Sequence, residues 1–326
     1  MKFLTEFFNS GTVAQQNKRR MGALIIAVTA ALLAVALIVL MIASIATMVK
    51  NNKPNEDDSE GEGNGIPSGY TTTTFEGVYT TAEGSLLLLD ATHPYTGSAN
   101  NVQPAPDKRA KDEGGNNLYR GDYGDISLTQ ETLDAFNAMM LAFHEAQKDQ
   151  SGYEVGRLYL DSNLAPKSVT PSADTKAVLQ SGTGLILADQ AMSSTDNEVS
   201  VYDSTTSKGK GVYAWIYDHA HEYGFVRASE AEGEENVFRY VGVVHATYLE
   251  DKGQTVAEYL ETLTNRGVSK PLAVSVRGAD NKNVNYQVYY LAGGEDKLVP
   301  EQYNYTVSGD NQGGFVVIVD RSTKKN

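Results

Sequence analysis

The feature that most constrains this chain is the apolar run at residues 21–49, which contains no charged residue. A helix rises 1.5 Å per residue, so this run is long enough to cross the roughly 30 Å hydrocarbon core of a bilayer with some tilt. The basic Lys-Arg-Arg triplet at 18–20 precedes it, and acidic residues follow it between 56 and 62. The positive-inside rule therefore predicts a cytoplasmic N-terminus, residues 1–20, and an extracytoplasmic remainder.

The alternative for this run is a secretory signal peptide cleaved near Ser44-Ile45-Ala46. The apolar run exceeds the usual signal-peptide core of about 7 to 15 residues, which favours an uncleaved anchor. Residues 50–69 follow and are rich in Gly, Asn, Ser and acidic residues, so we expect an acidic flexible linker. The sequence thus predicts a single-pass protein of the cell membrane with its main domain on the outer side.

Composition excludes several kinds of chemistry. The 326-residue chain has no cysteine, which rules out disulfides, thiolate metal sites and a cysteine nucleophile. The formal net charge of -14 argues against nucleic acid as a partner. A nucleophile elbow, a P-loop and a dinucleotide-binding fingerprint are all missing from the sequence, so serine or nucleotide chemistry has no support.

The spacing of apolar residues predicts an α+β domain after the linker. Helical spacing and capping residues predict helices, whereas short alternating or apolar runs between turn formers predict strands. The predicted helices are residues 128–147, 212–223 and 255–267, and the predicted strands are 84–90, 155–160 and 236–244. From residue 270 onward only strands are expected, at 272–276, 284–291, 305–307 and 315–320.

Residues 215–260, with Phe-Arg-Tyr-Val-Gly at 238–242, resemble the C-terminal half of the VanY-type D-alanyl-D-alanine carboxypeptidases. The resemblance implies a VanY-like zinc DD-peptidase domain, with a small antiparallel sheet and flanking helices, over residues 70–267. A small all-β extension over 268–326 would follow, of a kind found in some VanY-like proteins of Gram-positive bacteria. The dipeptide His93-Pro94 also matches the family in its order along the chain.

The family binds zinc through the motifs S-x-H-x-x-G-x-A-x-D and E-x-x-H. On this chain Ser181 falls at the first histidine position, Ala188 at the aspartate position and Val237 at the last histidine position. Glu234 falls at the position of the general base. The resemblance therefore implies that the three metal ligands are lost and that no zinc is bound, although the base position keeps its glutamate. Asp189 lies one residue beyond Ala188, which in a strand places its side chain on the opposite face.

The histidines do not suggest another metal site. His219 and His221 are two residues apart on a predicted helix, so their side chains diverge. We expect His219 to be a buried core residue, and His221 and His245 to be structural like the family histidines that they match. His93 and His144 show no ligand spacing with each other or with the acidic residues.

These observations leave three functional hypotheses. The first is a membrane-anchored pseudoenzyme that binds peptidoglycan stem peptides or an envelope protein. The second is an active zinc DD-carboxypeptidase that trims stem peptides with non-standard ligands. The third is a structural envelope component. The sequence does not indicate the oligomeric state, and the family's substrate-binding arginine has no clear match, since the residues after Arg157 differ from the family pattern.

Overall fold

The computed structural model describes residues 68–325 except for 74–78, 98–101, 105–108, 122–125, 162–169, 191–197, 207, 230, 279–280 and 294–296. All of these residues lie in one compact unit, Gly65–Asn326. The predicted transmembrane run at 21–49 lies outside the described residues. Within them, the helices are all too short or too polar to cross a membrane.

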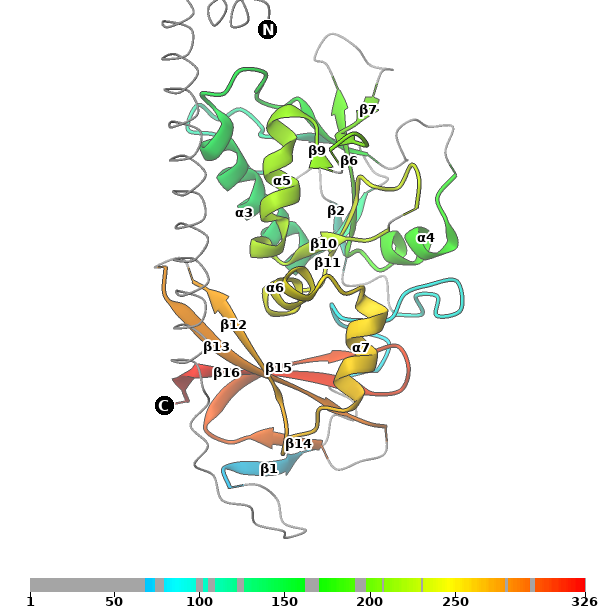
Figure 1. Ribbon diagram of the computed structural model, residues 1–326, viewed down its shortest axis with the longest axis vertical. Coiled ribbons are helices and arrows are strands. Elements are labelled where there is room, and N and C mark those ends of the chain that lie inside the picture. The colour runs from blue at the N-terminus through cyan, green and yellow to red at the C-terminus, as the bar shows by residue number, and fades with distance from the viewer. Residues whose placement is uncertain are drawn as a thin grey trace, which may run out of the picture. The chain divides into compact units, whose positions relative to one another are not determined.

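The larger sheet has six strands in the order β10-β11-β6-β5-β3, with β7 paired to β6. The pairs are antiparallel except for β3 with β5. The strands are β3 (Arg120–Gly121), β5 (Leu158–Asp161), β6 (Gly184–Gln190), β7 (Glu198–Ser200), β10 (Phe225–Arg227) and β11 (Val237–Tyr240). The mixture of this sheet with flanking helices agrees with the predicted α+β class (Figure 1).

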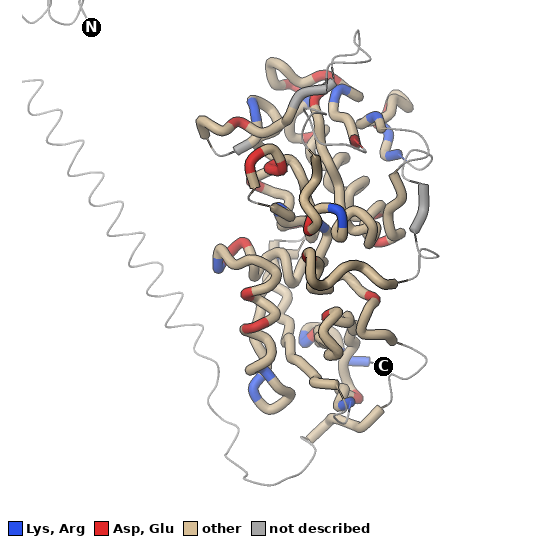
Figure 2. The backbone as a smooth tube through the Cα atoms, turned by 90° about the vertical axis from the view of Figure 1, so that its right-hand side faces the viewer, with Lys and Arg blue, Asp and Glu red and all other residues tan. Residues whose placement is uncertain are grey.

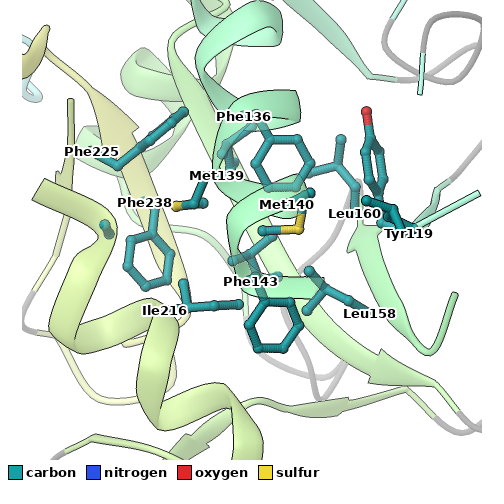
Figure 3. Packing of buried hydrophobic residues seen from close by; sticks show 14 of the residues in the cluster. Tyr119, Phe136, Met139, Met140, Phe143, Leu158, Leu160, Ile216, Phe225 and Phe238 are labelled. Carbon is teal, nitrogen blue, oxygen red and sulfur yellow. The ribbon is translucent and has the colours of Figure 1, made fainter. Parts of the chain in front are cut away.

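Helix α3 (Gln130–Gln147) covers one face of this sheet. Its N-cap is Thr129, whose side chain accepts a hydrogen bond from the Thr132 amide, so the helix begins two residues later than predicted. Its apolar positions pack against β5, β10 and β11, as Figure 3 shows for Phe136 and Phe143. The large aromatic and methionine side chains in this cluster form the main core of the upper part of the molecule in Figure 1.

The predicted helix at 212–223 consists of three short pieces: η3 (Gly211–Tyr213), α5 (Ala214–His219) and η4 (Ala220–Tyr223). Gly224 ends it in the left-handed conformation, with φ of 86°, as its sequence position indicates. The prediction that His219 is buried is wrong. Its side chain is 38% exposed, stacks on Trp215 and bonds to Glu222, because it lies at the solvent edge of the apolar stripe.

A second sheet has four antiparallel strands in the order β12-β13-β16-β15. They are β12 (Leu272–Arg277), β13 (Asn283–Leu291), β15 (Tyr303–Gly309) and β16 (Phe315–Lys324). All four strands were predicted, since their alternating apolar residues are bounded by turn formers. Three further pairs are short: β1 (Tyr70–Thr73) with β14 (Lys297–Pro300), β2 (Val102–Pro104) with β4 (Ser127–Thr129), and β8 (Tyr202–Asp203) with β9 (Lys208–Gly209).

Helices α6 (Val243–Lys252) and α7 (Val256–Thr264) pack on the second sheet through one apolar core. The core contains Tyr259 and Leu263 from α7 together with Val288 and Val316 from the sheet. Thr255 and Glu258 form a capping box at the start of α7, where the sequence predicts a helix. The apolar core therefore joins residues from both sides of position 267, while a domain boundary at that position remains a prediction.

Two predicted strands differ from the structure. Residues 84–90, of which Leu86, Leu87 and Leu89 are buried, pair with no strand, because their backbone bonds to other groups: Leu86 N–H donates to the Ser308 hydroxyl and Leu88 N–H to the Asp310 carbonyl. The strand predicted for 236–244 ends at Tyr240, and Gly242, with φ of 87°, turns the chain into α6. Charged residues of both signs are interspersed along the described chain (Figure 2).

Candidate functional site

Two of the three ligand positions inferred from the family lie together on the face of the larger sheet opposite α3. Val237 on β11 is paired with Ile186 on β6, and Ala188 lies two residues further along the same face of β6. All three side chains are fully buried. Leu179 and Ala228 pack against Ile186 and Val237. The residues at this position form an apolar contact with no group that binds zinc, so they do not fit the family's metal.

Ser181, at the third ligand position, follows α4 (Ala173–Gln180) directly. Its hydroxyl donates to the Val178 carbonyl at 2.7 Å and lies 2.7 Å from the Thr183 hydroxyl. The side chain is buried and ends the helix by bonding to it. Ser181 thus has a complete structural role at the C-terminal end of α4.

Glu234, at the base position, lies at the other end of α4. Its carboxylate accepts hydrogen bonds from the Ser172 amide at 2.6 Å, the Ser172 hydroxyl at 3.0 Å and the Thr175 hydroxyl at 2.8 Å. Burial alone raises the pKa of Glu234, but these bonds and one from Ser229 outweigh it and leave the pKa below its usual value. The eight-residue helix is about 12 Å long, so the carboxylate of Glu234 and the hydroxyl of Ser181 bond to opposite ends of it.

Asp189 is on the opposite face of β6 from Ala188, as the alternation of a strand predicts. There its carboxylate forms an ion pair with Arg157, with 2.5 Å between Nε and Oδ1. The hydrogen bond from Arg157 to the Asp189 carboxylate stabilises the charged guanidinium and so raises the pKa of Arg157. The ion pair connects the start of β5 to β6. It gives both Arg157 and Asp189 a structural role that needs no metal.

The histidines have different surroundings. His245 is fully buried beside the Tyr259 hydroxyl, and burial lowers its pKa to about 3, so it is neutral. His144 lies 2.8 Å from the Tyr153 hydroxyl, and His93 bonds to Asp90. His221 lines a separate cavity beside Arg277. In the part of the chain that the structure describes, no three His, Asp or Glu residues come together as metal ligands.

Arg239 is the residue that sequence reasoning missed. It is 3% exposed and lies on the same sheet face as Val237, two residues along β11. One terminal nitrogen donates to the carbonyls of Ser85 and Leu87, at 3.3 and 2.5 Å, whereas Nε has no hydrogen-bond partner among the described residues. Burial lowers the pKa of Arg239 to about 10, so it still carries its charge at neutral pH. The sequence signal that could have identified this buried charge was an arginine within the apolar strand Val-Phe-Arg-Tyr.

A cavity of about 450 Å³ opens beside Arg239. It is lined by β10, the end of α6 and the start of α7, including Gln254 and Ala257, and by Asp90 and Asp174. The volume is within the usual range of small-molecule sites, about 300 to 1,000 Å³. The cavity thus lies beside the face that carries the degenerate ligand positions.

Known proteins are similar to this chain in sequence and in fold. No model of a protein family matches the chain. A D-alanyl-D-alanine carboxypeptidase from Enterococcus faecium is 28% identical over 115 residues, which are 32% of this chain and 35% of that enzyme. The similarity in sequence therefore spans about a third of the length of the relative.

The fold is similar to that of the vancomycin-resistance D,D-dipeptidase VanXYg, solved in complex with a D-Ala-D-Ala phosphinate analogue. The TM-score is 0.51 at 17% identity, over 77% of this chain and 98% of VanXYg. VanYB, solved in complex with D-alanine-D-alanine, matches with a TM-score of 0.31 at 17% identity over 55% of this chain and 98% of its own, too low to bear on the fold. In part of its sequence and in its fold, the chain resembles the VanY-like D-alanyl-D-alanine carboxypeptidases.

Proposed function

We propose that the chain is a membrane-anchored, extracytoplasmic pseudoenzyme whose carboxypeptidase-like domain binds peptidoglycan peptides or an envelope protein. The observation that carries this proposal is the apolar contact of Val237 with Ile186 beside Ala188, at the positions where the family holds zinc. A hydrolase of this kind needs the ion to polarise the carbonyl and to activate water. The side chains at these positions supply neither.

Glu234 supports the same proposal. A general base must have a free oxygen within reach of the water that it deprotonates. Here both carboxylate oxygens accept hydrogen bonds from Ser172 and Thr175 at the start of α4. The hydrogen bonds from Ser172 and Thr175 favour the ionised carboxylate and hold it against the start of α4, so Glu234 has a structural role.

Peptides ending in D-alanine are the partners that the similar proteins suggest, because VanXYg was solved with an analogue of D-Ala-D-Ala. The test uses the full chain, purified in detergent, with a stem pentapeptide as probe. We expect binding by calorimetry, no stoichiometric zinc by mass spectrometry and no release of D-alanine. About one zinc per chain together with chelator-sensitive release would instead show an active carboxypeptidase.

The membrane anchor can be tested separately, since the chain has no cysteine to give background labelling. A Glu261→Cys variant carries an exposed thiol in the carboxypeptidase-like domain, because Glu261 is exposed. A Ser10→Cys variant places the thiol before the apolar run in the sequence. In intact cells we expect an impermeant maleimide to label Cys at 261 and to leave position 10 unlabelled until the cells are opened. Release of the labelled domain into the medium would mean that the apolar run is cleaved.

A further inference from the structure

Another cavity, of about 430 Å³, lies where the start of α3 meets the end of β11. Its volume is within the usual range of small-molecule sites. Two carboxylates line it, those of Glu83 and Glu131, together with the aromatic side chains of Tyr95 and Tyr240. Among the described residues around the cavity, none is Lys, Arg or His, so its lining carries negative charge that no cation in the cavity balances.

Both carboxylates are accessible, since Glu131 is exposed and Glu83 is half-buried. Each of them lies close enough to a tyrosine of the cavity to affect its ionisation. Burial, and then the charge of Glu131, raise the pKa of Tyr240 to about 12. Burial, and then the charge of Glu83, raise the pKa of Tyr95. Negative charge beside aromatic side chains is the combination that attracts organic cations.

Thr183 adds a hydrogen-bond acceptor to this lining, where its side chain is 3% exposed. The hydroxyl of Ser181 donates its one proton to the Val178 carbonyl. The 2.7 Å bond between Ser181 and Thr183 must therefore use the proton of the Thr183 hydroxyl. In the described part of the chain no donor reaches the Thr183 oxygen, so this oxygen can only accept a hydrogen bond from a ligand or from water.

This set of acceptors favours an organic ammonium group over a metal ion. Calcium takes about six to eight oxygen ligands, most of them from carboxylates, carbonyls and water. In the part of the chain that the structure describes, no three His, Asp or Glu residues come together as metal ligands. A primary ammonium group carries several N–H donors, which match the carboxylates of Glu83 and Glu131 and the hydroxyl of Thr183.

We propose that this cavity binds a small molecule through a primary ammonium group. The ammonium pairs with Glu83 and Glu131 and donates to Thr183, and the apolar part of the ligand lies beside the two tyrosines. Of the three degenerate zinc positions, only Ser181 lines this cavity. The proposal needs neither a metal nor peptide binding, so it stands apart from the proposed function.

The probes are n-butylamine, n-butanol and butyltrimethylammonium, each titrated into the full chain in detergent and followed by calorimetry. Butanol has the same alkyl chain without the charge, and butyltrimethylammonium has the charge without an N–H donor. We expect butylamine to bind at least about tenfold more tightly than either, because only butylamine combines charge with hydrogen bonds to charged acceptors. Calcium chloride is titrated in parallel as the alternative cation.

Glu131→Gln removes one charge from the cavity and keeps the size of the side chain. Glu131 is exposed, so the variant should fold. Glu83→Gln makes the same change from the other side of the cavity. Glu261→Gln is the matched control, because Glu261 is exposed on α7 and does not line the cavity. We expect each cavity variant to weaken butylamine binding at least about fivefold and the control to change it less than about twofold.

Three results would overturn the site. Butylamine might bind no more tightly than butanol, or equally well to Glu131→Gln, Glu83→Gln and the wild type, and either result would show that the carboxylates hold no cation. Equal binding of butylamine and butyltrimethylammonium would remove the role of the N–H donors. Calcium that binds more tightly than butylamine, and is lost in the same variants, would identify a metal site instead. The stem pentapeptide tests the proposed function independently of these results.

Discussion

The Glu234 carboxylate holds the first turn of α4 through Ser172 and Thr175. Removing it in Glu234→Ala leaves the part-buried amide and hydroxyl of Ser172 and the buried hydroxyl of Thr175 without their acceptor, which costs about 1–3 kcal/mol of unfolding free energy. Glu234→Gln keeps one acceptor oxygen and should cost less. Chemical denaturation measures both, and Glu232→Ala is the matched control because Glu232 is exposed in the same loop. Equal effects at 232 and 234 would contradict the capping role.

His245 makes stability depend on pH. Burial lowers its pKa from 6.5 to about 3 in the folded protein, whereas the unfolded chain takes up a proton below about 6.5. The unfolding free energy must therefore fall as the pH drops from 6.5 towards 3, by up to about 1.4 kcal/mol per pH unit.

His245→Gln should flatten this slope when thermal or urea unfolding is followed from pH 7 to 4. His219→Gln is the matched control substitution, because the His219 side chain is 38% exposed. Parallel curves for the wild type and His245→Gln would mean that His245 titrates normally in the folded state.

For single residues, the sequence predicted what the side chain can do chemically more often than it predicted which residues the side chain contacts. Val237 and Ala188 were recognised as unable to bind zinc from their identity alone, while their contact through Ile186 depends on strand register. The role of Glu234 was not predictable, since Ser172 is 62 residues away in sequence. Arg239 was read only as part of a family motif, although a charge within an apolar strand indicates a buried ionic group.

The link between β11 and α6 depends on Gly242, whose φ of 87° and ψ of 148° are accessible almost only to glycine. A Cβ there would meet only the Ser85 hydroxyl at 3.9 Å, so Gly242→Ala is opposed by backbone strain rather than by a clash. We expect a loss of about 1–3 kcal/mol in unfolding free energy.

Gly267→Ala is the control for this substitution, because Gly267 is exposed and its Cβ position is open. It should change stability by less than about 0.5 kcal/mol in the same denaturant titration. A Gly242→Ala variant as stable as Gly267→Ala would show that the turn can adopt another conformation.

Elements with a local signal were predicted well, as the capping box of α7 and the strands after residue 270 show. The prediction of a strand at 84–90 was wrong. A run of leucines has the same sequence pattern whether its backbone pairs with a strand or bonds to isolated groups, as it does here. Helix α6 was missed because Val243 and Val244 favour a strand locally, and only the turn at Gly242 separates them from β11.

The described part of the molecule has a core that crosses position 267, with Leu260 and Leu263 of α7 packed on Val274 and Val288 of the second sheet. Removing residues 268–326 would expose these side chains of α7 to water. We expect the truncated chain to lose its near-ultraviolet circular dichroism and the full chain to melt in a single transition. Two transitions in the full chain, or a folded truncated form, would instead establish a domain boundary at 267.

For the whole molecule, the sequence predicted an α+β fold that resembles the VanY-type carboxypeptidases. The similarity of the fold to VanXYg over 77% of the chain agrees with this prediction. The joining of the two sheets was not predictable. It depends on contacts such as the bond from Leu86 to Ser308, which local patterns do not encode.

That bond also determines when the protein can fold. Leu86 and Ser308 are 222 positions apart, and Arg239 donates to carbonyls of the same segment, so residues 85–87 have no complete set of partners until the last strands exist. Such long-range contacts slow folding. A chain emerging from the ribosome must therefore keep Leu86 and Leu87 unburied until almost all of it has been made. During that interval the exposed leucines are prone to aggregation, which a protein closed by local contacts avoids.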